Sequence, residues 1–329
     1  MFDSQSVAAA RERLQAAQTI SIVSHERPDG DAVGSALGLA LALEAAGKTV
    51  TVALADGVPT SFRHLAGASR VVSQGDPHAD CRVLVDCGDP SRPAAAWRPE
   101  WPVDINVDHH KTNTRFAAIN IVAPEAVATA AMLAELIPQW GLEITPQAAD
   151  ALLTGMLTDT IGFRTSNVTA DTLRLAASLM DKGANLSELY FKALVERSFE
   201  ALRYWGQGLS RVQREDGLVW TSLTLEDRRI SGYSGNDDAD LVGYLPTVRG
   251  AKIGVIFVEQ PNNQVKVSWR ARPGWDVSTL AVRFGGGGHA PAAGATINGT
   301  LAEVQAAVLA ATRDLLTHAQ DSFKREGEN

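Results

Sequence analysis

The sequence predicts an α/β protein, in which a doubly wound, mainly parallel-sheet domain is joined by a helical connector to a smaller α+β domain. Three observations support this prediction. In the first half of the chain, short apolar runs alternate with helical stretches, as they do in doubly wound sheets. Some of these runs end in acidic residues, which is typical of parallel strands that carry ligands at their carboxyl ends. Beyond about residue 215, longer strands joined by a turn replace this alternation.

The elements of the first part follow one another in a regular order. Four runs have the branched, alternating character of buried strands; they cover residues 19–24, 49–55, 82–88 and 103–110. The helical stretches end at a glycine or begin with a proline, as helices commonly do; they cover residues 36–46, 125–140, 146–160 and 170–182. This alternation predicts a domain that spans residues 1–190.

The second part begins after a stretch that stays helical and carries charges on a polar face. We interpret residues 191–214 as a helical connector and residues 215–329 as the second domain. The sequences GLVWTSLTL, AKIGVIFVEQ and VKVSWRAR predict its strands, and PNNQ predicts a hairpin turn between the last two. A short helix near residues 277–284, a glycine run and a final amphipathic helix from about residue 301 complete this domain.

Composition limits the class of protein. The 329 residues suffice for two domains with buried cores. No apolar run approaches the roughly 20 residues that cross a bilayer, and the N-terminus lacks the apolar core of a signal peptide, so we expect a cytoplasmic protein that binds no membrane. The formal net charge of −8 argues against a protein that grips double-stranded DNA by neutralising many phosphates. Cys81 and Cys87 are interpreted as small core residues.

Acidic residues and histidines gather in four short segments at the ends of predicted strands and helices. In the first segment, SHERPDGDAVGS, two aspartates lie close enough to repel each other unless a cation or strong donors hold them. The segments contribute His25, Asp29 and Asp31, then Asp86, then Asp108, His109 and His110, and finally Asp159. Imidazoles and carboxylates together suit divalent ions such as manganese.

Each of these residues also has a structural explanation when it is taken alone. Asp86 could be a helix cap, His109 a satisfied core histidine, and Asp159 an acid at a helix C-terminus, where negative charge is unfavourable. It is their joint occurrence that predicts a metal site.

The run GGGGH at residues 285–289 is a separate signal, because four glycines are costly in any regular element. Consecutive glycine amides can form an anion-binding nest, to which His289 would add a donor. A flexible hinge is the alternative. A dinucleotide-binding loop is less well supported, since the G-x-G-x-x-G spacing is incomplete and no strand precedes the glycines.

Five motifs occur in order between His25 and His289, namely HERPDGDAVGS, VDCGDP, VDHH, GMLTDTIGFR and FGGGGH. Together they resemble the DHH phosphoesterase superfamily with its DHH-associated C-terminal domain. The resemblance implies a hydrolase with two divalent cations, Mn²⁺ in the first place and Mg²⁺ as the alternative. It implies that His25 and Asp29 hold one ion, that Asp31, His109 and Asp159 hold the other, and that Asp86 bridges them.

The resemblance also implies roles around the reacting phosphate. His110 is similar to the family residue that faces the scissile phosphate, and Asp108 is expected to orient His109 or the surrounding loop. The predicted catalytic residues are therefore His110, Asp86 and Asp108. Two metals can activate a water molecule and stabilise both the attacking and the leaving oxygen of a displacement, while His110 neutralises charge or passes a proton to the leaving oxygen.

Substrate binding is expected in the second domain. There the glycine run resembles a clamp on the terminal phosphate or nucleotide of the substrate, and Arg270 resembles an arginine that holds phosphate or base. Arg272 is the alternative to Arg270, and a solvated arginine on a strand is an equally good explanation. The predicted substrate-binding residues are Arg270, Gly286, Gly287, Gly288 and His289.

The compact two-domain form most resembles the nanoRNase branch of the superfamily. That branch implies degradation of short single-stranded oligoribonucleotides to 5′-mononucleotides, and removal of the 3′-phosphate of adenosine 3′,5′-bisphosphate (pAp). Two alternatives stay open within the class: a phosphodiesterase for cyclic di-AMP or its linear product pApA, and a RecJ-like single-strand exonuclease. A nucleotide-binding regulator without hydrolytic activity is the alternative from another class. A homodimer is compatible with the resemblance.

Overall fold

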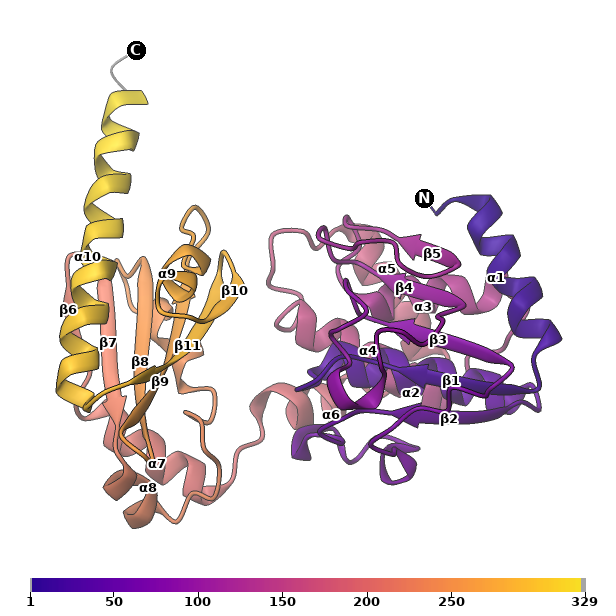
Figure 1. The fold of residues 1–329 in the computed structure, drawn as a ribbon, viewed down its shortest axis with the longest axis horizontal. Coiled ribbons are helices and arrows are strands. Elements are labelled where there is room, and N and C mark those ends of the chain that lie inside the picture. The colour runs from indigo at the N-terminus through magenta and orange to yellow at the C-terminus, as the bar shows by residue number, and fades with distance from the viewer. Residues whose placement is uncertain (1, 327–329) are drawn as a thin grey trace. The chain divides into compact units, whose positions relative to one another are not determined.

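The computed structural model describes the backbone of residues 2–326, and the side chains of these residues except His289 and residues 318–326. The chain divides into two compact units between Glu196 and Arg197 (Figure 1). The stretch expected as a connector, residues 191–214, lies across this division. Its π-helical turn (Phe191–Val195) belongs to the first unit, and α7 (Phe199–Leu209) belongs to the second.

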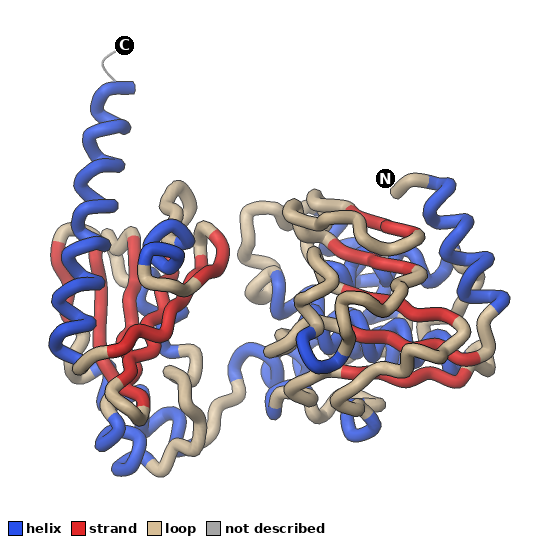
Figure 2. The backbone as a smooth tube through the Cα atoms, viewed as in Figure 1, coloured by secondary structure: helices blue, strands red, loops and turns tan. Residues whose placement is uncertain are grey.

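The first unit is built on a five-stranded parallel sheet with the strand order β2-β1-β3-β4-β5 (Figure 2). The strands are β1 (Thr19–Val23), β2 (Thr49–Ala53), β3 (Cys81–Val85), β4 (Ile105–Asp108) and β5 (Ile119–Val122). The predicted parallel α/β architecture is confirmed, but β5 was missed. Because β5 has four residues and most of them are only partly buried, no continuous apolar run marks it.

The strand order places the first two predicted ligand segments side by side. From β1 the chain passes to β2 on one side, and it then crosses to β3 on the other side of β1. In doubly wound sheets, ligands bind at the carboxyl ends of the strands where the order reverses in this way. The residues that follow β1 and β3 therefore face the position at which a site is expected.

The helices of the first unit are α1 (Ser4–Ala16), α2 (Gly30–Ala45), α3 (Thr129–Gln139), α4 (Pro146–Asp159), α5 (Ala170–Asp181) and α6 (Leu186–Tyr190). α2 begins well before its predicted start at residue 36. The carboxylate of Asp29 caps it by accepting hydrogen bonds from the amides of Asp31 and Ala32, both at 3.0 Å. The first turn of α2 thus contains part of the expected acidic loop. None of the helices within residues 2–326 has the combination of length and apolarity that crossing a bilayer requires.

Glycines let α2, α3 and α4 approach one another closely. A Cβ atom on Gly34 of α2 would lie 2.4 Å from the carbonyl oxygen of Ala151 on α4. A Cβ atom on Gly155 of α4 would lie 2.5 Å from the Cβ of Ala130 on α3 and 2.9 Å from Oδ1 of Asp31. Real side chains do not fit at these distances, so glycine is required where the three helices converge on Asp31.

The second unit contains a six-stranded mixed sheet with the order β10-β11-β9-β8-β7-β6. Its strands are β6 (Gln213–Glu215), β7 (Leu218–Leu223), β8 (Ile253–Gln260), β9 (Gln264–Ala271), β10 (Gly287–His289) and β11 (Ala292–Asn298). Its helices besides α7 are α8 (Leu225–Ser231), the 3₁₀ segment η5 (Leu241–Thr247), α9 (Ser278–Arg283) and α10 (Leu301–Glu326). The predicted hairpin is confirmed, because β8 and β9 pair in antiparallel fashion up to Gln260 and Gln264.

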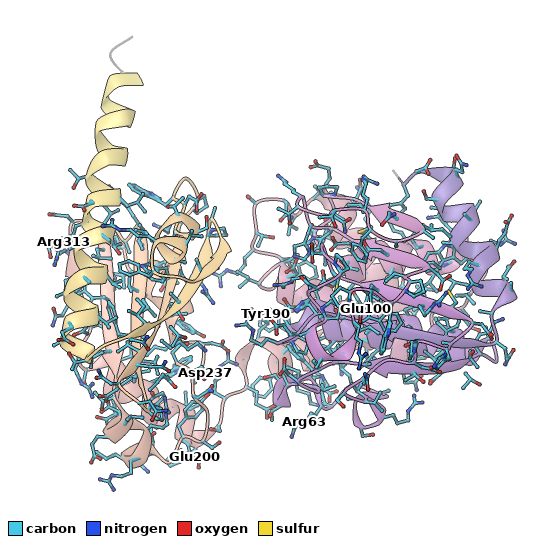
Figure 3. All side chains as sticks on the ribbon, viewed as in Figure 1. Arg63, Glu100, Tyr190, Glu200, Asp237 and Arg313 are labelled. Atoms are coloured by element: carbon cyan, nitrogen blue, oxygen red, sulfur yellow. The ribbon has the colours of Figure 1, made fainter. Side chains whose placement is uncertain are left out.

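A side-chain contact connects α10 to β6, which is an edge strand of this sheet. Arg313, labelled in Figure 3, donates to Oε2 of Glu215 on β6 at 2.9 Å. Both residues are exposed. The core under α10 includes the buried rings of Trp269 and Phe257. The second unit therefore has an apolar core of its own.

The glycine run has a structural role that the sequence analysis did not foresee. Gly285 donates its amide to the carbonyl of Val282, and Gly286 donates its amide to the carbonyl of Ala281. With Gly285 at φ 76°, these two bonds form a C-terminal cap on α9. The amide of Gly286 is thus used within the fold, while the expected role of this glycine in substrate binding stays a prediction.

The remaining glycines of the run belong to β10, which pairs with β11. A Cβ atom on Gly288 would lie 2.5 Å from the Cα of Ala293, and this glycine has φ 141°. Glycine at this position therefore permits the close approach of the two strands.

Candidate metal centre

The residues of the four acidic segments meet at the carboxyl edge of the parallel sheet. His25 follows β1, Asp86 directly follows β3, and Asp108 is the last residue of β4 with His109 and His110 after it. These strands are neighbours in the order β1-β3-β4, so their ends lie next to one another (Figure 1). The sheet thus brings together side chains that are up to 85 positions apart in the sequence, from His25 to His110.

The first group of candidate ligands consists of His25, Asp29 and Asp86. The Nε2 atom of His25 is 3.8 Å from Oδ1 of Asp29 and 3.5 Å from Oδ2 of Asp86. The other ring nitrogen, Nδ1, is 2.8 Å from the carbonyl oxygen of Glu26. Since a carbonyl only accepts, Nδ1 carries the proton of the neutral ring, and the Nε2 lone pair points toward the carboxylates.

The second group consists of Asp31, His109 and Asp159. The Nε2 atom of His109 is 3.9 Å from Oδ2 of Asp31 and 3.5 Å from Oδ2 of Asp159, which is the last residue of α4. Its Nδ1 atom lies 3.3 Å from the carbonyl oxygen of Ala126, so this ring also turns Nε2 toward the acids. The two histidines are therefore oriented alike by backbone carbonyls.

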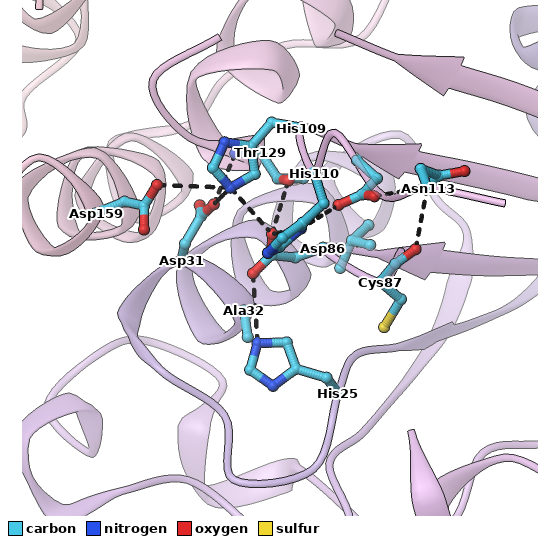
Figure 4. A network of polar contacts seen from close by, with 12 residues as sticks. His25, Asp31, Ala32, Asp86, Cys87, His109, His110, Asn113, Thr129 and Asp159 are labelled. Carbon is cyan, nitrogen blue, oxygen red and sulfur yellow. Dashed lines mark hydrogen bonds and ion pairs between the residues drawn. The ribbon is translucent and has the colours of Figure 1, made fainter. Parts of the chain in front are cut away.

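Asp86 lies between the two groups. Its Oδ2 faces His25, whereas its Oδ1 is 3.7 Å from Nε2 of His109 (Figure 4). Its side chain is almost completely buried, and its backbone has the left-handed φ of 57°. One carboxylate thus presents a different oxygen to each group, as a ligand shared by two ions does.

The donor set fits divalent cations. In each group, and in a third made by Asp86, His109 and His110, the ligand atoms lie within 4.8 Å of one another. Carboxylates together with imidazoles suit Mn²⁺ better than they suit Mg²⁺, which prefers oxygen ligands. Among the side chains that the structure describes, the carboxylates of the centre form ion pairs with histidines and with no lysine or arginine.

The pKa values reflect this crowding of negative charge. Burial and the charges of Asp86 and Asp159 raise the pKa of Asp31 well above its ordinary value. Burial also raises the pKa of Asp159, to about 6. Burial acts in the same direction on Asp86, but the neighbouring His25 and the charge of His109 outweigh it and lower its pKa to about 2. Asp86 is therefore ionised at neutral pH, whereas the raised pKa values of Asp31 and Asp159 show that nearby positive charge does not compensate their burial.

Asp31 is held by main-chain and side-chain donors. Its Oδ2 accepts a hydrogen bond from the amide of Thr129 at 2.6 Å, and its Oδ1 accepts from the amide of Ala130 at 2.8 Å. The hydroxyl of Ser35 also donates to Oδ1, at 3.2 Å. These donors fix the orientation of a carboxylate that is almost fully buried.

His110 belongs to a separate chain of hydrogen bonds. Its Nδ1 is 2.7 Å from Oδ1 of the buried Asp108, and Oδ2 of Asp108 accepts from Nδ2 of Asn113 at 2.6 Å. At the end of β4, Asp108 therefore forms its hydrogen bond with His110, the second residue after it. The hydrogen bond with Asp108 is the main reason why the pKa of His110 is raised to about 9.

Two residues of this centre, Thr129 and Asn113, were not predicted from the sequence. The hydroxyl of Thr129 donates to Oδ1 of Asp86 at 2.9 Å. Asn113 also donates to Oδ1 of Asn106 at 2.8 Å. A threonine at a helix start and an asparagine in a loop are ordinary in any sequence, so only the contacts reveal their roles.

The second unit brings two of its predicted substrate-binding residues into one row of the sheet. Ala292 on β11 pairs with His289 on β10 and with Arg270 on β9. The backbones of His289 and Arg270 therefore lie on either side of the same residue, and the His289 side chain falls outside the described part of the chain. The Arg270 guanidinium donates to the carbonyl of Trp269 at 3.0 Å.

Comparisons with known proteins agree with this architecture. The DHH family, N-terminal domain, matches residues 19–156, and the DHHA1 domain matches residues 229–317. A bifunctional oligoribonuclease and PAP phosphatase NrnA from Thermus thermophilus is 39% identical over 307 residues, which cover 91% of each chain. The protein of the same name from Bacillus subtilis is 27% identical, over 85% of this chain and 89% of that one.

A solved structure has nearly the same fold over the whole chain. The crystal structure of an exopolyphosphatase-related protein from Bacteroides fragilis has a TM-score of 0.90 at 25% identity. The match covers 98% of this chain and 99% of that chain. The combination of both units is therefore shared with that protein.

Proposed function

Because the chain belongs to the DHH family and carries a DHHA1 domain, we propose that it is a metal-dependent phosphodiesterase that degrades short oligoribonucleotides to 5′-mononucleotides. We extend the proposal to removal of the 3′-phosphate of pAp. The observation that carries it is the carboxylate of Asp86, which offers Oδ2 to the group with His25 and Oδ1 to the group with His109. The similarity to the two oligoribonucleases and PAP phosphatases supports the choice of substrate.

In this proposal, His25 and Asp29 hold one divalent cation, Asp31, His109 and Asp159 hold the other, and Asp86 is shared. Such a pair of ions, when bound, supplies an activated water and positive charge for the phosphoryl oxygens. We propose Mn²⁺ as the principal metal because two imidazoles take part. The buried amides on Asp31 and the carbonyls on both histidines hold the ligands in place.

His110 is proposed to act on the reacting phosphate. Asp108 fixes its Nδ1, so Nε2 is the ring atom that can donate to a phosphoryl oxygen or to the leaving oxygen of the sugar. The raised pKa of His110 keeps the ring protonated at neutral pH, where it can donate. The row formed by Arg270, Ala292 and His289 in the second unit is proposed to bind the end of the substrate.

Product analysis of a 5′-labelled RNA series tests the proposal. The series runs from the dinucleotide to about a 24-mer, with pAp, pApA and cyclic di-AMP alongside, each with Mn²⁺ and with a chelator. We expect fast, Mn²⁺-dependent release of mononucleotides from the shortest RNAs and of phosphate from pAp. Asp171→Asn, an exposed acid on α5, is the control that keeps full activity.

Three other outcomes would replace the proposal. A preference for long strands would indicate a RecJ-like exonuclease. Faster hydrolysis of cyclic di-AMP than of linear dinucleotides would indicate a cyclic-dinucleotide phosphodiesterase. Tight binding without hydrolysis would indicate a regulator. The location in the cytoplasm and the homodimer, both expected from the sequence, remain part of the proposal; sedimentation of the purified chain tests the latter.

A further inference from the structure

Thr129 contacts both halves of the candidate metal centre through two different groups. Its amide donates to Oδ2 of Asp31 at 2.6 Å, and its hydroxyl donates to Oδ1 of Asp86 at 2.9 Å (Figure 4). The residue is fully buried at the start of α3. A single residue therefore connects one ligand of the second group with the carboxylate that lies between the two groups.

The hydroxyl of Thr129 is not needed by its own helix. α3 has no capping side chain, because the residue before Thr129 is Ala128. The first amides of α3 are satisfied instead by Asp31 from α2. By contrast, the hydroxyl of Thr154 on α4 donates to the carbonyl of Asp150 in its own helix, at 2.8 Å. The hydroxyl of Thr129 is turned away from its own backbone and toward Asp86.

This hydroxyl determines how Asp86 is oriented. A carboxylate can rotate about its last torsion, and this torsion has broad minima. The bond from Thr129 fixes Oδ1 on the side of His109, so that Oδ2 is left facing His25. Without the hydroxyl, Asp86 could turn both oxygens toward one histidine, and the two groups would no longer share it in a defined way.

We propose that Thr129 is a positioning residue that sets Asp86 as the shared ligand of the two ions. This inference rests on the dinuclear site of the proposed function. Groups that orient a metal ligand typically change metal affinity or activity by about 10–100-fold when they are lost. The loss of the Thr129 hydroxyl is therefore expected to weaken binding of the second Mn²⁺ by about 10–100-fold and to reduce the magnetic coupling between the ions.

Metal binding by purified protein tests this inference without any substrate. The variants are Thr129→Val, which keeps the shape, Thr129→Ala, which removes the hydroxyl at less steric risk, and Thr129→Ser, which restores it. The matched control is Thr154→Val, which removes an equally buried hydroxyl from α4. Calorimetric titration with Mn²⁺ gives the two affinities, and electron paramagnetic resonance separates a coupled pair from an isolated ion.

The expected pattern is specific to the hydroxyl. Thr129→Val and Thr129→Ala should both lose affinity for the second ion and show the six-line signal of isolated Mn²⁺, whereas Thr129→Ser and Thr154→Val should match the wild type. If one hydroxyl-free variant fails to fold, the other still decides. Wild-type affinity and coupling in a folded hydroxyl-free variant would overturn the inference, as would equal losses in Thr129→Ser.

The same measurements separate this inference from the proposed function. A wild-type chain that binds two coupled ions but hydrolyses none of the nucleotides would refute the function and leave the role of Thr129 standing. A wild-type chain that binds a single ion would overturn the role of Thr129.

Discussion

The amino and carboxyl ends of the strands in the five-stranded sheet both carry aspartates, partly buried at the amino end and fully buried at the carboxyl end, and their partners differ. At the amino edge, Asp104 directly precedes β4 and accepts hydrogen bonds from Nη2 of Arg13 at 2.9 Å and from Nε of Arg82 at 2.6 Å. At the carboxyl edge, Asp31 and Asp86 accept hydrogen bonds from backbone amides and two hydroxyls and lie near histidines. Among the side chains that the structure describes, no arginine or lysine is paired with them.

This difference separates a structural acid from a candidate metal ligand. Burial raises the pKa of Asp104, but the hydrogen bonds from Arg82 and Arg13 outweigh it, so that the net shift is downward. Burial likewise raises the pKa of Asp31, and there the neighbouring carboxylates add to the effect. The chain thus supplies its own counter-charge at one edge, whereas in the proposed function bound cations neutralise the other. Four experiments test this contrast.

The largest effect is expected at the shared carboxylate. Asp86→Asn keeps the shape of the side chain but removes the charge and one of the two acceptor oxygens, so one ion loses its bridge. We expect hydrolysis of a diribonucleotide to fall by more than about 100-fold, since groups that merely orient a ligand already reach that value. Steady-state kinetics with saturating Mn²⁺ measure this, and circular dichroism confirms the fold. Activity within about 10-fold of the wild type would mean that Asp86 bridges nothing.

Chelation should affect only the carboxyl edge. A ligand that binds the folded state at about 100 times its dissociation constant stabilises by about 2.7 kcal/mol. For a unit of this size, removing Mn²⁺ should lower the melting temperature by about 5–10 °C. Calorimetry with and without a chelator measures the shift. No shift in the wild type would contradict a metal centre, whereas Asp104→Asn should show the same shift as the wild type.

At the amino edge, Asp104→Asn should reduce stability without changing metal affinity. The substitution weakens hydrogen bonds to two charged guanidinium groups, which suggests a loss of about 1.5–3 kcal/mol. Because the pKa of Asp104 is lowered in the folded state, its stabilisation is present at neutral pH and is lost as the pH falls through that lowered pKa. Urea unfolding at several pH values should therefore show a smaller loss of stability in acid for the variant. Weakened Mn²⁺ binding by this variant would contradict the division between a structural acid at the amino edge and metal ligands at the carboxyl edge.

The smallest effect is expected from Asp108→Asn, which keeps a hydrogen bond to His110 but removes the charge. The pKa of His110 should move down from about 9 toward its ordinary value, and the rate of hydrolysis should fall by about 10-fold. Because the folded-state pKa is raised, the stabilisation from His110 is complete below pH 6.5 and disappears as the pH rises through about 9. Nuclear magnetic resonance titration of metal-free protein measures the pKa. An unchanged value would show that Asp108 does not hold the proton of His110.

Much of the fold could be predicted because its signals are local. The strands β1 to β4 coincide with runs of apolar and branched residues, and β8 and β9 surround a turn whose two asparagines have positive φ. β5 and the true start of α2 were missed for physical reasons. A short, partly exposed strand resembles a loop, and α2 begins in an acidic, glycine-containing segment that is capped by the side chain of Asp29.

The candidate ligands could be inferred from their motifs, but their supporting contacts could not. Asp31 is held by Thr129 and Ala130, about a hundred residues away, and no pattern in the sequence connects these positions. In the glycine run, by contrast, the pattern was conspicuous. Its composition indicated an anion site, whereas two of its amides cap α9 in the structure. Composition therefore indicates which residues are able to perform a role, but their hydrogen-bond partners in the folded chain determine whether they perform it.

Gly155 shows what the site demands of the rest of the protein. In the middle of a helix, alanine is usually more stable than glycine by about 1 kcal/mol. Here the added methyl group would collide with Ala130 and with the oxygen of Asp31. A substitution that improves most helices would therefore damage both the packing and the candidate metal centre. Selection for heat resistance in this chain should consequently leave Gly155 untouched and find its gains elsewhere, a local case of activity constraining the stability that evolution can reach.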